Sequence, residues 1–588
     1  MSKGAIKGLI ALGVIVVIII AVISVLNMPR RVFDYTLGEN GILLGSSNNE
    51  EKDGTLRIPS KIEGKDVTVI NSYAFQDYDD ITKVVIPDSV ELIDSYAFWG
   101  CDELKKIKFG KNLKRIGANA FDSVRFVTEL ELPYGLKEIG EEAFYNCYHL
   151  KTINIPATVE KIGEGAFSLC NELESINVAP ENPYFKSVDG SLYSKDGKIL
   201  YFYNISKNET TVTIPDGVTE IHGKAFKGHW TVKNVVFSDT VEVIGESAFV
   251  DCSRLESVKF GTSLKEIKSN AFNKCRDLSS VTGEFQLEII GTNAFYSCQS
   301  LTSFSFGREL KEIGMGAFQY SGITSAILPS TVETIGDMVF YCCNGLTTVS
   351  VPSTVKSIGK DIFKDARNIK YNEYDNAYYV GDNQNPYLIL IKAKDTYITG
   401  VTVHEQTRVI ESKAFDGCPK IERVSIPKSV ERIGANAFSG CTSIKAVIFS
   451  SSAAVIENEA FLNCTSLERV MLGTFIKEIG NKAFYGCTAL TSVVIPKNLE
   501  KLGDSAFYGC TLLASTIELE KESYVGTGAF EGCSSLTTVK IGKDVLSVGY
   551  GAFKDCPLLT IKCESEAKPA QWSNEWNIGC NVEWGAEN

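Results

Sequence analysis

A repeat of 23 residues dominates this sequence and limits what the chain can fold into. The stretch IGEEAFYNCYHLKTINIPATVEKIGEGAFSLC, residues 139–170, contains one motif twice. Nineteen phenylalanines hold the same place in the motif, 23 residues apart within three blocks except for one step of 22: Phe75, Phe98, Phe121, Phe144, Phe167; Phe226, Phe249, Phe272, Phe295, Phe318, Phe340, Phe363; Phe415, Phe438, Phe461, Phe484, Phe507, Phe530, Phe553. A unit this short cannot bury its own apolar face, so neighbouring units must stack and share one core.

One tract of each unit predicts a strand. Residues 150–155, LKTINI, alternate apolar and polar side chains over their second half, and Pro156 ends the alternation. Strands of successive units would pair in parallel, about 4.8 Å apart. Thirteen of the nineteen units have glycine four residues before the phenylalanine, as at Gly140, which suggests a turn with positive φ. The sequence therefore predicts a solenoid of about 19 repeats.

The motif also resembles a known family. The pattern C-x-x-L-x-x-I-x-I-P-x-x-V-x-x-I-G-x-x-A-F is similar to the 23-residue repeat of the BspA-like leucine-rich repeat family of bacterial-type surface proteins, over roughly residues 55–565. The resemblance implies a leucine-rich repeat solenoid with a curved parallel β-sheet on the concave face and short turns or helical pieces on the convex face. It also implies display at a cell surface, and some members of the family are described as adhesins.

The N-terminus carries a candidate membrane anchor. Residues 9–26, LIALGVIVVIIIAVISVL, are 18 residues without a charge, which is enough for a transmembrane helix. A cleaved signal peptide would have a shorter apolar core and a small-x-small cleavage site, and no convincing site follows. We therefore expect a single-pass cell membrane protein with a short inner tail and the bulk of the chain extracellular.

Two interruptions of the repeat and two non-repeating ends complete the predicted organisation. Both interruptions contain hairpin-like stretches, the first around Asp196-Gly197. The expected order is an inner tail at 1–8, the anchor at 9–26, a juxtamembrane segment and the start of an N-terminal cap at 27–54, repeats at 55–177, a hairpin insertion at 178–213, repeats at 214–370, a hairpin insertion at 371–399, repeats at 400–562 and a tryptophan-rich C-terminal cap at 563–588.

The cysteines could be disulfide halves, metal ligands, reactive groups or packing residues. Fourteen of the seventeen lie three residues after the repeat phenylalanine, and other units place Val124 or Ala366 there. Interchange with valine and alanine favours a small buried slot. The predicted structural ladder includes Phe144, Cys147, Phe167, Cys170, Cys464 and Cys487. Cys563 and Cys580, outside this column, are the better candidates for one terminal disulfide.

Composition and motifs argue against several classes of function. The net charge of −13, with no run rich in lysine and arginine, argues against nucleic acid as a partner. Only four histidines and no C-x-x-C pair occur, and the side chains of the adjacent Cys342 and Cys343 would point to opposite sides, so we predict no metal site. His229 falls in the cysteine slot, where a core role is expected. Without a nucleophile motif or a phosphate-binding loop, we predict no cofactor and no enzymatic activity.

The outward strand positions are the candidate binding surface. Ten residues after the phenylalanine, four successive units carry the apolar residues Ile448, Met471, Val494 and Ile517, which we predict to form an exposed patch. The alternatives are that β-branched residues there simply favour strands, or that the second insertion folds over these side chains. The predicted function is binding of a protein or glycan ligand at the cell surface, in adhesion or host and cell interaction. The alternative is a structural or scaffolding role in the envelope without a soluble ligand.

Overall fold

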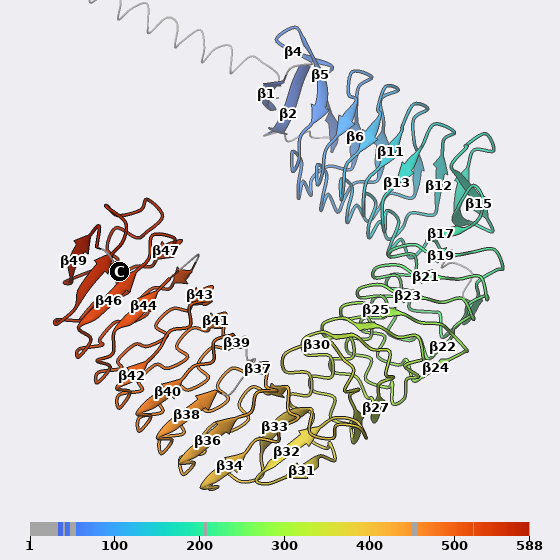
Figure 1. The fold of residues 1–588 in the computed structure, drawn as a ribbon. Helices are drawn as coiled ribbons and strands as arrows, with labels where there is room; N and C mark the ends of the chain where they lie inside the picture. The colour runs from blue at the N-terminus through green and yellow to red at the C-terminus, as the bar shows by residue number, and fades with distance from the viewer. Residues whose placement is uncertain are drawn as a thin grey trace, which may run out of the picture. The chain divides into compact units, whose positions relative to one another are not determined.

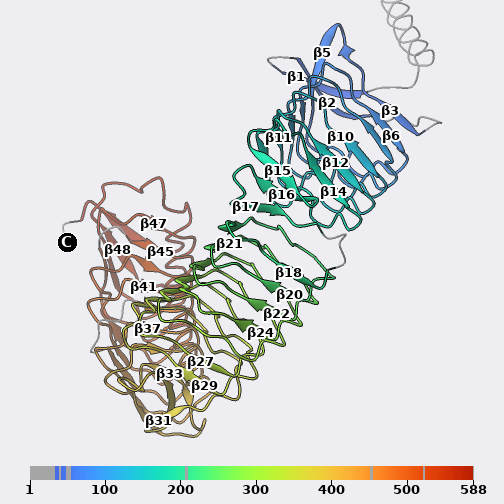
Figure 2. The ribbon, with the colours of Figure 1, turned by 90° about the vertical axis from the view of Figure 1, so that its right-hand side faces the viewer.

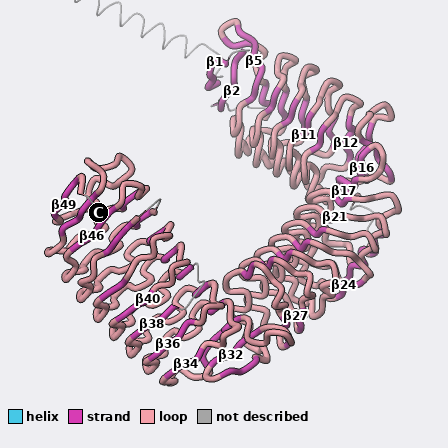
Figure 3. Tube along the Cα trace, viewed as in Figure 1, coloured by secondary structure: helices cyan, strands magenta, loops and turns pink. Residues whose placement is uncertain are grey.

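The structure is a computed structural model that describes residues 33–38, 41–47, 54–204, 209–449, 455–520 and 523–586. These residues form strands joined by turns, and Figure 3 colours none of them as helix. The described residues divide into two compact units, one ending at residue 301 and the other beginning at residue 302. Strands of both units are labelled in Figure 1. The predicted tail at 1–8 and anchor at 9–26 lie outside the described residues. Among the described residues, no helix has the length and apolar character needed to cross a membrane.

Most repeats contribute two strands, one to each of two separate parallel ladders, while the repeat that begins at Phe295 has no strand at residues 301–307. In the first unit, β12 (Thr152–Ile155) pairs in parallel with β14 (Ser175–Val178), which confirms the strand predicted within residues 150–155. A second strand of two residues, β13 (Lys161–Ile162), pairs in parallel with β11 (Glu138–Ile139). The sequence did not predict this second ladder. We call the two series the long-strand ladder and the short-strand ladder.

In the first unit the remaining long strands are β3 (Thr55–Arg57), β6 (Lys83–Val85), β8 (Lys106–Lys108), β10 (Glu129–Glu131), β18 (Thr211–Thr213), β20 (Asn234–Val236), β22 (Ser257–Lys259) and β24 (Ser280–Thr282). The remaining short strands are β5 (Lys65–Ile70), β7 (Leu92–Ile93), β9 (Arg115–Ile116), β17 (Ile199–Phe202), β19 (Glu220–Ile221), β21 (Val243–Ile244), β23 (Glu266–Ile267) and β25 (Ile289–Ile290). Figure 2 shows β18, β20, β22 and β24 following one another as stacked arrows.

The second unit repeats the same two ladders. Its long strands are β27 (Ser325–Ile327), β29 (Thr348–Ser350), β34 (Gly400–Thr402), β36 (Arg423–Ile426), β38 (Ala446–Phe449), β40 (Arg469–Met471), β42 (Ser492–Val493), β44 (Ile517–Leu519), β46 (Thr538–Ile541), β48 (Thr560–Cys563) and β49 (Asn581–Trp584). Its short strands are β26 (Glu312–Ile313), β28 (Thr334–Ile335), β30 (Ser357–Ile358), β33 (Ile389–Ala393), β35 (Val409–Ile410), β37 (Arg432–Ile433), β39 (Val455–Ile456), β41 (Glu478–Ile479), β43 (Lys501–Leu502), β45 (Tyr524–Val525) and β47 (Ser547–Val548).

The phenylalanine column forms the centre of the core. The rings of Phe98 and Phe121 stack with their centroids 5.1 Å apart, and those of Phe461 and Phe484 lie 5.2 Å apart. All four side chains are fully buried. The backbone N–H of Phe484 also donates to the carbonyl oxygen of Ala506, in the next repeat, at 2.7 Å. Ring stacking and a backbone hydrogen bond therefore join successive repeats at the same residue.

The glycine that recurs four residues before the phenylalanine does not have the predicted positive φ, so its recurrence has another cause. The backbone at Gly140 and Gly480 is not in the left-handed region, whereas Glu142 has a φ of 50°. A Cβ on Gly140 would lie 2.5 Å from the carbonyl carbon of Gly117, and one on Gly480 would lie 2.5 Å from the backbone nitrogen of Asn458. Glycine is therefore favoured in this column because the stacked turns approach closely, and the few units with a side chain there depart from this packing.

Both insertions are antiparallel and restart the short-strand ladder. In the first, β15 (Phe185–Val188), β16 (Ser191–Ser194) and β17 pair antiparallel in sequence order, and β17 then pairs in parallel with β19. In the second, β31 (Asn372–Tyr374), β32 (Ala377–Val380) and β33 pair antiparallel, and β33 then pairs in parallel with β35. The last strand of each insertion therefore serves as the first layer of the repeats that follow.

The ends of the repeat array carry non-repeating elements. At the N-terminal end, β1 (Phe33–Gly38) and β2 (Gly41–Ser47) form an antiparallel pair, and β4 (Lys61–Ile62) pairs antiparallel with β5. At the C-terminal end, Trp572 and Trp576 are buried with their ring centroids 5.0 Å apart. The ring of Trp576 meets Phe553, the last member of the phenylalanine column, edge-on at 6.1 Å. Tryptophan thus covers the open end of the core.

Candidate functional site

The four residues predicted as a binding patch occupy two different environments. Ile448, Met471 and Val494 are exposed by 47, 62 and 77% respectively. Ile448 lies opposite Met471 in the parallel pair of β38 and β40, and Val494 directly follows β42, the next strand. Ile517 is fully buried, so its predicted exposure is wrong. The three exposed residues are called the apolar stripe below.

A register shift explains the burial of Ile517. It pairs with Val539, which faces the core, while Glu518 pairs with Lys540. A shift of one residue exchanges the two faces of a strand, so Glu518 takes the outward position. Its carboxylate lies 3.3 Å from the ammonium group of Lys540. Counting ten residues from Phe507 fails here because one additional residue precedes β44.

Polar side chains border the apolar stripe. On the preceding strand Ser425 lies opposite Ile448, and at the other end Glu518 holds the outward position. On the same outward face, two residues before the apolar position, Arg423 and Arg469 are exposed. Three apolar side chains from three adjacent repeats thus form one exposed surface within a polar frame, which is typical of an interaction site.

The predicted structural ladder lies inside the core. Its buried members are Phe144, Cys147, Phe167, Cys170, Cys464 and Cys487. Each cysteine thiol donates to the carbonyl oxygen of a phenylalanine in the preceding repeat, at 3.3 Å from Cys487 to Phe461 and 3.2 Å from Cys464 to Phe438. Burial raises the pKa of Cys487 to about 12. Because the thiolate is the reactive form, these cysteines pack and donate hydrogen bonds in the folded protein.

Labelling of single cysteines tests this assignment. In the folded chain, iodoacetamide is expected to label Cys464 and Cys487 on the order of 100-fold more slowly than Cys342, because access needs local opening of the repeat, at roughly 3 kcal/mol. Cys342 is the matched reference, since it is only partly buried and lies beside the buried Cys343. Peptide mass spectrometry at several labelling times gives the rates. Equal rates for all of these thiols would contradict the buried-donor role.

The predicted terminal disulfide is not formed. Cys563 and Cys580 are both free thiols. Cys563 is buried at the end of β48, opposite Trp584 on β49. The thiol of Cys580 donates to the carbonyl oxygen of Phe553 at 3.1 Å, the same bond that the repeat cysteines make. Cys580 therefore continues the cysteine column into the C-terminal cap.

The histidine in the cysteine slot is also a core residue. His229 is buried, and burial lowers the pKa of its imidazole to about 3. Its Nδ1 lies 3.3 Å from the hydroxyl oxygen of Thr231. In the part of the chain that the structure describes, no group of three or more histidine, cysteine, aspartate or glutamate side chains is arranged to hold a metal ion.

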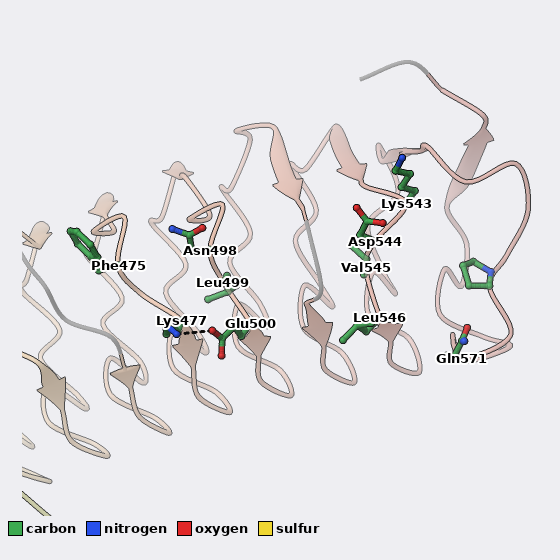
Figure 4. A pocket seen from close by; sticks show the side chains of 11 residues that line it. Phe475, Lys477, Asn498, Leu499, Glu500, Lys543, Asp544, Val545, Leu546 and Gln571 are labelled. Atoms are coloured by element: carbon green, nitrogen blue, oxygen red, sulfur yellow. Dashed lines mark hydrogen bonds and ion pairs between the residues drawn. The ribbon is translucent and has the colours of Figure 1, made fainter. Parts of the chain in front are cut away.

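A hollow of about 850 Å³ lies near the C-terminal end of the second unit (Figure 4). Phe475, from the turn after β40, is 64% exposed at one side of it, and Gln571 of the C-terminal cap lies at the other. Lys477 and Glu500, from adjacent repeats, form an ion pair of 2.8 Å along its wall. The hollow therefore combines an exposed aromatic ring with amide and charged groups.

A charged network at the second insertion was missed by the sequence. β30 is the last strand of its sheet, and two arginines from later repeats donate to backbone carbonyl groups beside it. Arg408 donates to Val355 and Lys356, and Arg432 donates to Gly359 at 2.8 Å. The arginines thereby supply donors at a sheet edge that lacks a paired strand.

Two carboxylates complete this network. Glu411 and Glu457 are buried, and both lie within 4.0 Å of the guanidinium group of Arg432. Oε2 of Glu411 accepts the backbone N–H of Asp361 at 3.1 Å. Burial raises the pKa of Glu411 to about 7. Both glutamates stand where most repeats have glycine, and that departure is the signal in the sequence that could have identified them.

The two ladders, the stacked phenylalanine column and the 23-residue period define a parallel β-solenoid of the leucine-rich repeat class. The chain belongs to the BspA type leucine rich repeat family, which it matches over residues 68–189, 200–321, 266–384, 394–514 and 469–571. The resemblance drawn from the repeat motif is therefore confirmed. The convex helical pieces that it implied are replaced by turns among the described residues.

Several solved bacterial structures are similar to this chain. A leucine-rich repeat protein from Bacteroides ovatus is 21% identical, with 95% of this chain and 98% of that chain covered and a TM-score of 0.27. A leucine rich cell surface protein from Faecalibacterium prausnitzii is 22% identical, with 59% and 96% covered and a TM-score of 0.32. A leucine-rich repeat protein from Eubacterium ventriosum is 23% identical, with 50% and 96% covered and a TM-score of 0.35. No curated protein matches the chain.

Proposed function

We propose that this protein is anchored in a bacterial cell membrane through residues 9–26 and binds a protein or glycan ligand outside the cell, in adhesion to host or neighbouring cells. Membership of the BspA type family supports a surface binding role. The relative from Faecalibacterium prausnitzii is described as a cell surface protein. We propose binding without catalysis for the following reason. Cysteines such as Cys464 are buried in the core, where burial raises the thiol pKa well above its ordinary value, and they do not face the apolar stripe.

The apolar stripe is the observation that carries this proposal. The same outward position in the first unit holds Asn154 and Asn177, whose side chains are hydrogen-bonded at 3.0 Å, and later the exposed Lys259. Polar residues therefore suffice for the fold at this position. Ile448, Met471 and Val494 leave apolar surface in water, and burying each against a partner would contribute about 1–2 kcal/mol. Binding explains why three successive repeats depart from the polar pattern.

Charge substitution in the apolar stripe tests the proposal. The double variant Met471→Glu, Val494→Glu is expected to weaken the recovered interaction by about tenfold or more, because buried apolar anchors dominate interfaces. The measurement is pull-down from host matrix and neighbouring-cell extracts, followed by affinity determination with the purified partner. Ile327→Glu is the matched control, since Ile327 is a 61% exposed residue on a long strand outside the stripe. Unchanged affinity in the double variant, or recovery of no ligand, would favour an envelope scaffolding role.

A further inference from the structure

The second insertion encloses a hollow of about 370 Å³ within the second unit, which we call the junction pocket. Three separate segments line it: residues 361–367 of the repeat before the insertion, Tyr371 with Ile391 and Lys392 of the insertion, and residues 411–413 of the repeat after it. Its volume is at the small end of ligand pockets, which hold roughly 300–1,000 Å³. The pocket exists because the insertion interrupts the close stacking of turns.

Each of the three segments contributes a cation without a carboxylate partner. Arg367, Lys392 and Lys413 all line the pocket and are exposed. No described carboxylate lies within 4.0 Å of their charged groups. The fourth cation of the lining, Lys364, pairs with Asp361 at 3.1 Å. Three like charges along the lining of one pocket favour the binding of an anion there.

Many lysines of the regular repeats form an ion pair with a carboxylate, whereas the three pocket cations form none with a described carboxylate. Elsewhere a lysine commonly pairs with a glutamate at the equivalent place in an adjacent repeat, as Lys477 does with Glu500 of the following repeat at 2.8 Å and Lys501 with Glu478 of the preceding one at 2.7 Å. The residues equivalent to Arg367 and Lys413 in the adjoining regular repeats are Asn344 and Asn436, which carry no charge. Three unpaired cations thus line one pocket, in a chain whose net charge is −13.

The remaining lining favours a ligand that also carries hydroxyl groups. Asp365 offers an exposed carboxylate as an acceptor, and Ser412 offers a hydroxyl. The ring of Tyr371 forms part of the wall and is held beneath the ammonium group of Lys392, 5.2 Å from the ring centroid. Glu411 is turned inward, with Oε2 accepting the backbone N–H of Asp361. A plain anion would satisfy the cations and leave Asp365 and Ser412 unused.

We propose that the junction pocket binds an acidic saccharide, with a carboxylate or sulfate group held by Arg367, Lys392 and Lys413. The saccharide hydroxyls donate to Asp365 and exchange hydrogen bonds with Ser412. This inference rests on the proposed surface-binding function and assigns it a ligand class. It gives the second insertion a role in recognition that is separate from the apolar stripe.

Calorimetry with the full chain and defined saccharides tests the inference. The probes are tetragalacturonate, its methyl ester, a chondroitin sulfate tetrasaccharide and sodium sulfate. We expect binding of at least one of the two acidic saccharides. The methyl ester should bind at least about tenfold more weakly because it loses the charged hydrogen-bonded contact. Sodium sulfate should also bind at least about tenfold more weakly because it has no saccharide hydroxyl groups to contact Asp365 and Ser412. Equal binding of the methyl ester, or of sodium sulfate alone, would overturn the proposal, as would absence of binding by both acidic saccharides.

Substitutions locate the binding in the pocket. Arg367→Glu and Lys392→Gln are each expected to weaken the acidic saccharide by about tenfold or more. Lys259→Glu, at an exposed lysine without an ion pair in the other unit, is the charge control and should leave affinity unchanged. Circular dichroism and the urea midpoint establish that each variant folds. Retained affinity in both pocket variants would place the saccharide elsewhere and overturn the proposal.

The two proposals fail separately. The double variant Met471→Glu, Val494→Glu should retain saccharide binding while it loses the partner of the apolar stripe. If the double variant loses the stripe partner but the parent chain binds no acidic saccharide, only the junction-pocket proposal fails. Saccharide binding without any stripe partner would remove only the role of the apolar stripe.

Discussion

Replacing Phe484 by alanine is expected to lower the free energy of unfolding of the surrounding repeats by about 3–5 kcal/mol. The ring is fully buried and stacks on Phe461 at 5.2 Å and on Phe507 at 5.1 Å. Its removal takes apolar contacts from two interfaces between repeats, since each repeat is stabilised mainly by its neighbours. The urea midpoint and amide hydrogen exchange of β41 and β43 measure the loss.

Phe475→Ala is the matched control for this substitution. Phe475 lies in the repeat immediately before Phe484 but is 64% exposed, so its truncation should change stability by no more than about 0.5 kcal/mol. Amide exchange should also show that the Phe484 variant is loosened near β41 and β43 and remains protected at distant repeats. Equal effects of the two substitutions would show that the phenylalanine column does not hold adjacent repeats together.

The repeat period made the core predictable. A phenylalanine every 23 residues, a cysteine three residues later and an alternating tract after it are regularities that only stacked parallel strands explain. The structure places the stacked rings and most of the long strands where this pattern puts them, although the tract after Phe295 forms no strand. The short strands escaped prediction because two residues between turns, such as Lys161 and Ile162, are too few to show a strand period.

Counting residues from the repeat phenylalanines did not predict the structure where the repeat is interrupted or shifted. Tyr203 stacks on Phe226 at 4.9 Å and donates its backbone N–H to Ala225, so it fills a phenylalanine position inside the first insertion. Its distance of 23 residues from Phe226 was the available signal. The shift that buries Ile517 has no such signal, because the spacing between Phe507 and Phe530 stays at 23.

The candidate site was only partly predictable for the same reason. Exposure of Met471 follows from its place on a regular strand, whereas the junction pocket depends on side chains that the insertion brings together. Arg432 meets Gly359 across 73 residues of sequence. Such contacts are set by how the insertion packs, and the repeat pattern contains no information on them.

The protonation of Glu411 is expected to make the stability of this junction depend on pH. Its side chain is buried beside Arg432 on β37, and the backbone N–H of Asp361 from the turn after β30 donates to it. Glu457 shares the same guanidinium group and also lies 3.3 Å from the ammonium group of Lys360. The second oxygen of Glu411 accepts no hydrogen bond from the described residues. Ionising this carboxyl is therefore costly, which accounts for a pKa of about 7.

Stability is expected to fall as pH rises from about 4.5 to 7, because the folded chain keeps the proton of Glu411 that the unfolded chain releases. The loss amounts to about 3 kcal/mol when complete. Glu411→Gln keeps an acceptor for Asp361 and removes the charge, so the variant should be more stable than the parent at pH 8 by up to about 3 kcal/mol and equal to it at pH 4. Urea unfolding across this pH range, with amide exchange at β30 and β35, measures the effect.

The control is Glu405→Gln, since Glu405 is exposed in the same repeat as Glu411. It should leave the pH dependence of the parent intact, because Glu405 lies in solvent and takes no part in the contacts of Arg432. If Glu411→Gln instead destabilised the junction at pH 8, the ionised carboxylate would have to stabilise Arg432 more than burial penalises it. That outcome would reverse the sign of the linkage and make the buried ion pair, and not the neutral acid, the form that holds the two sets of repeats together.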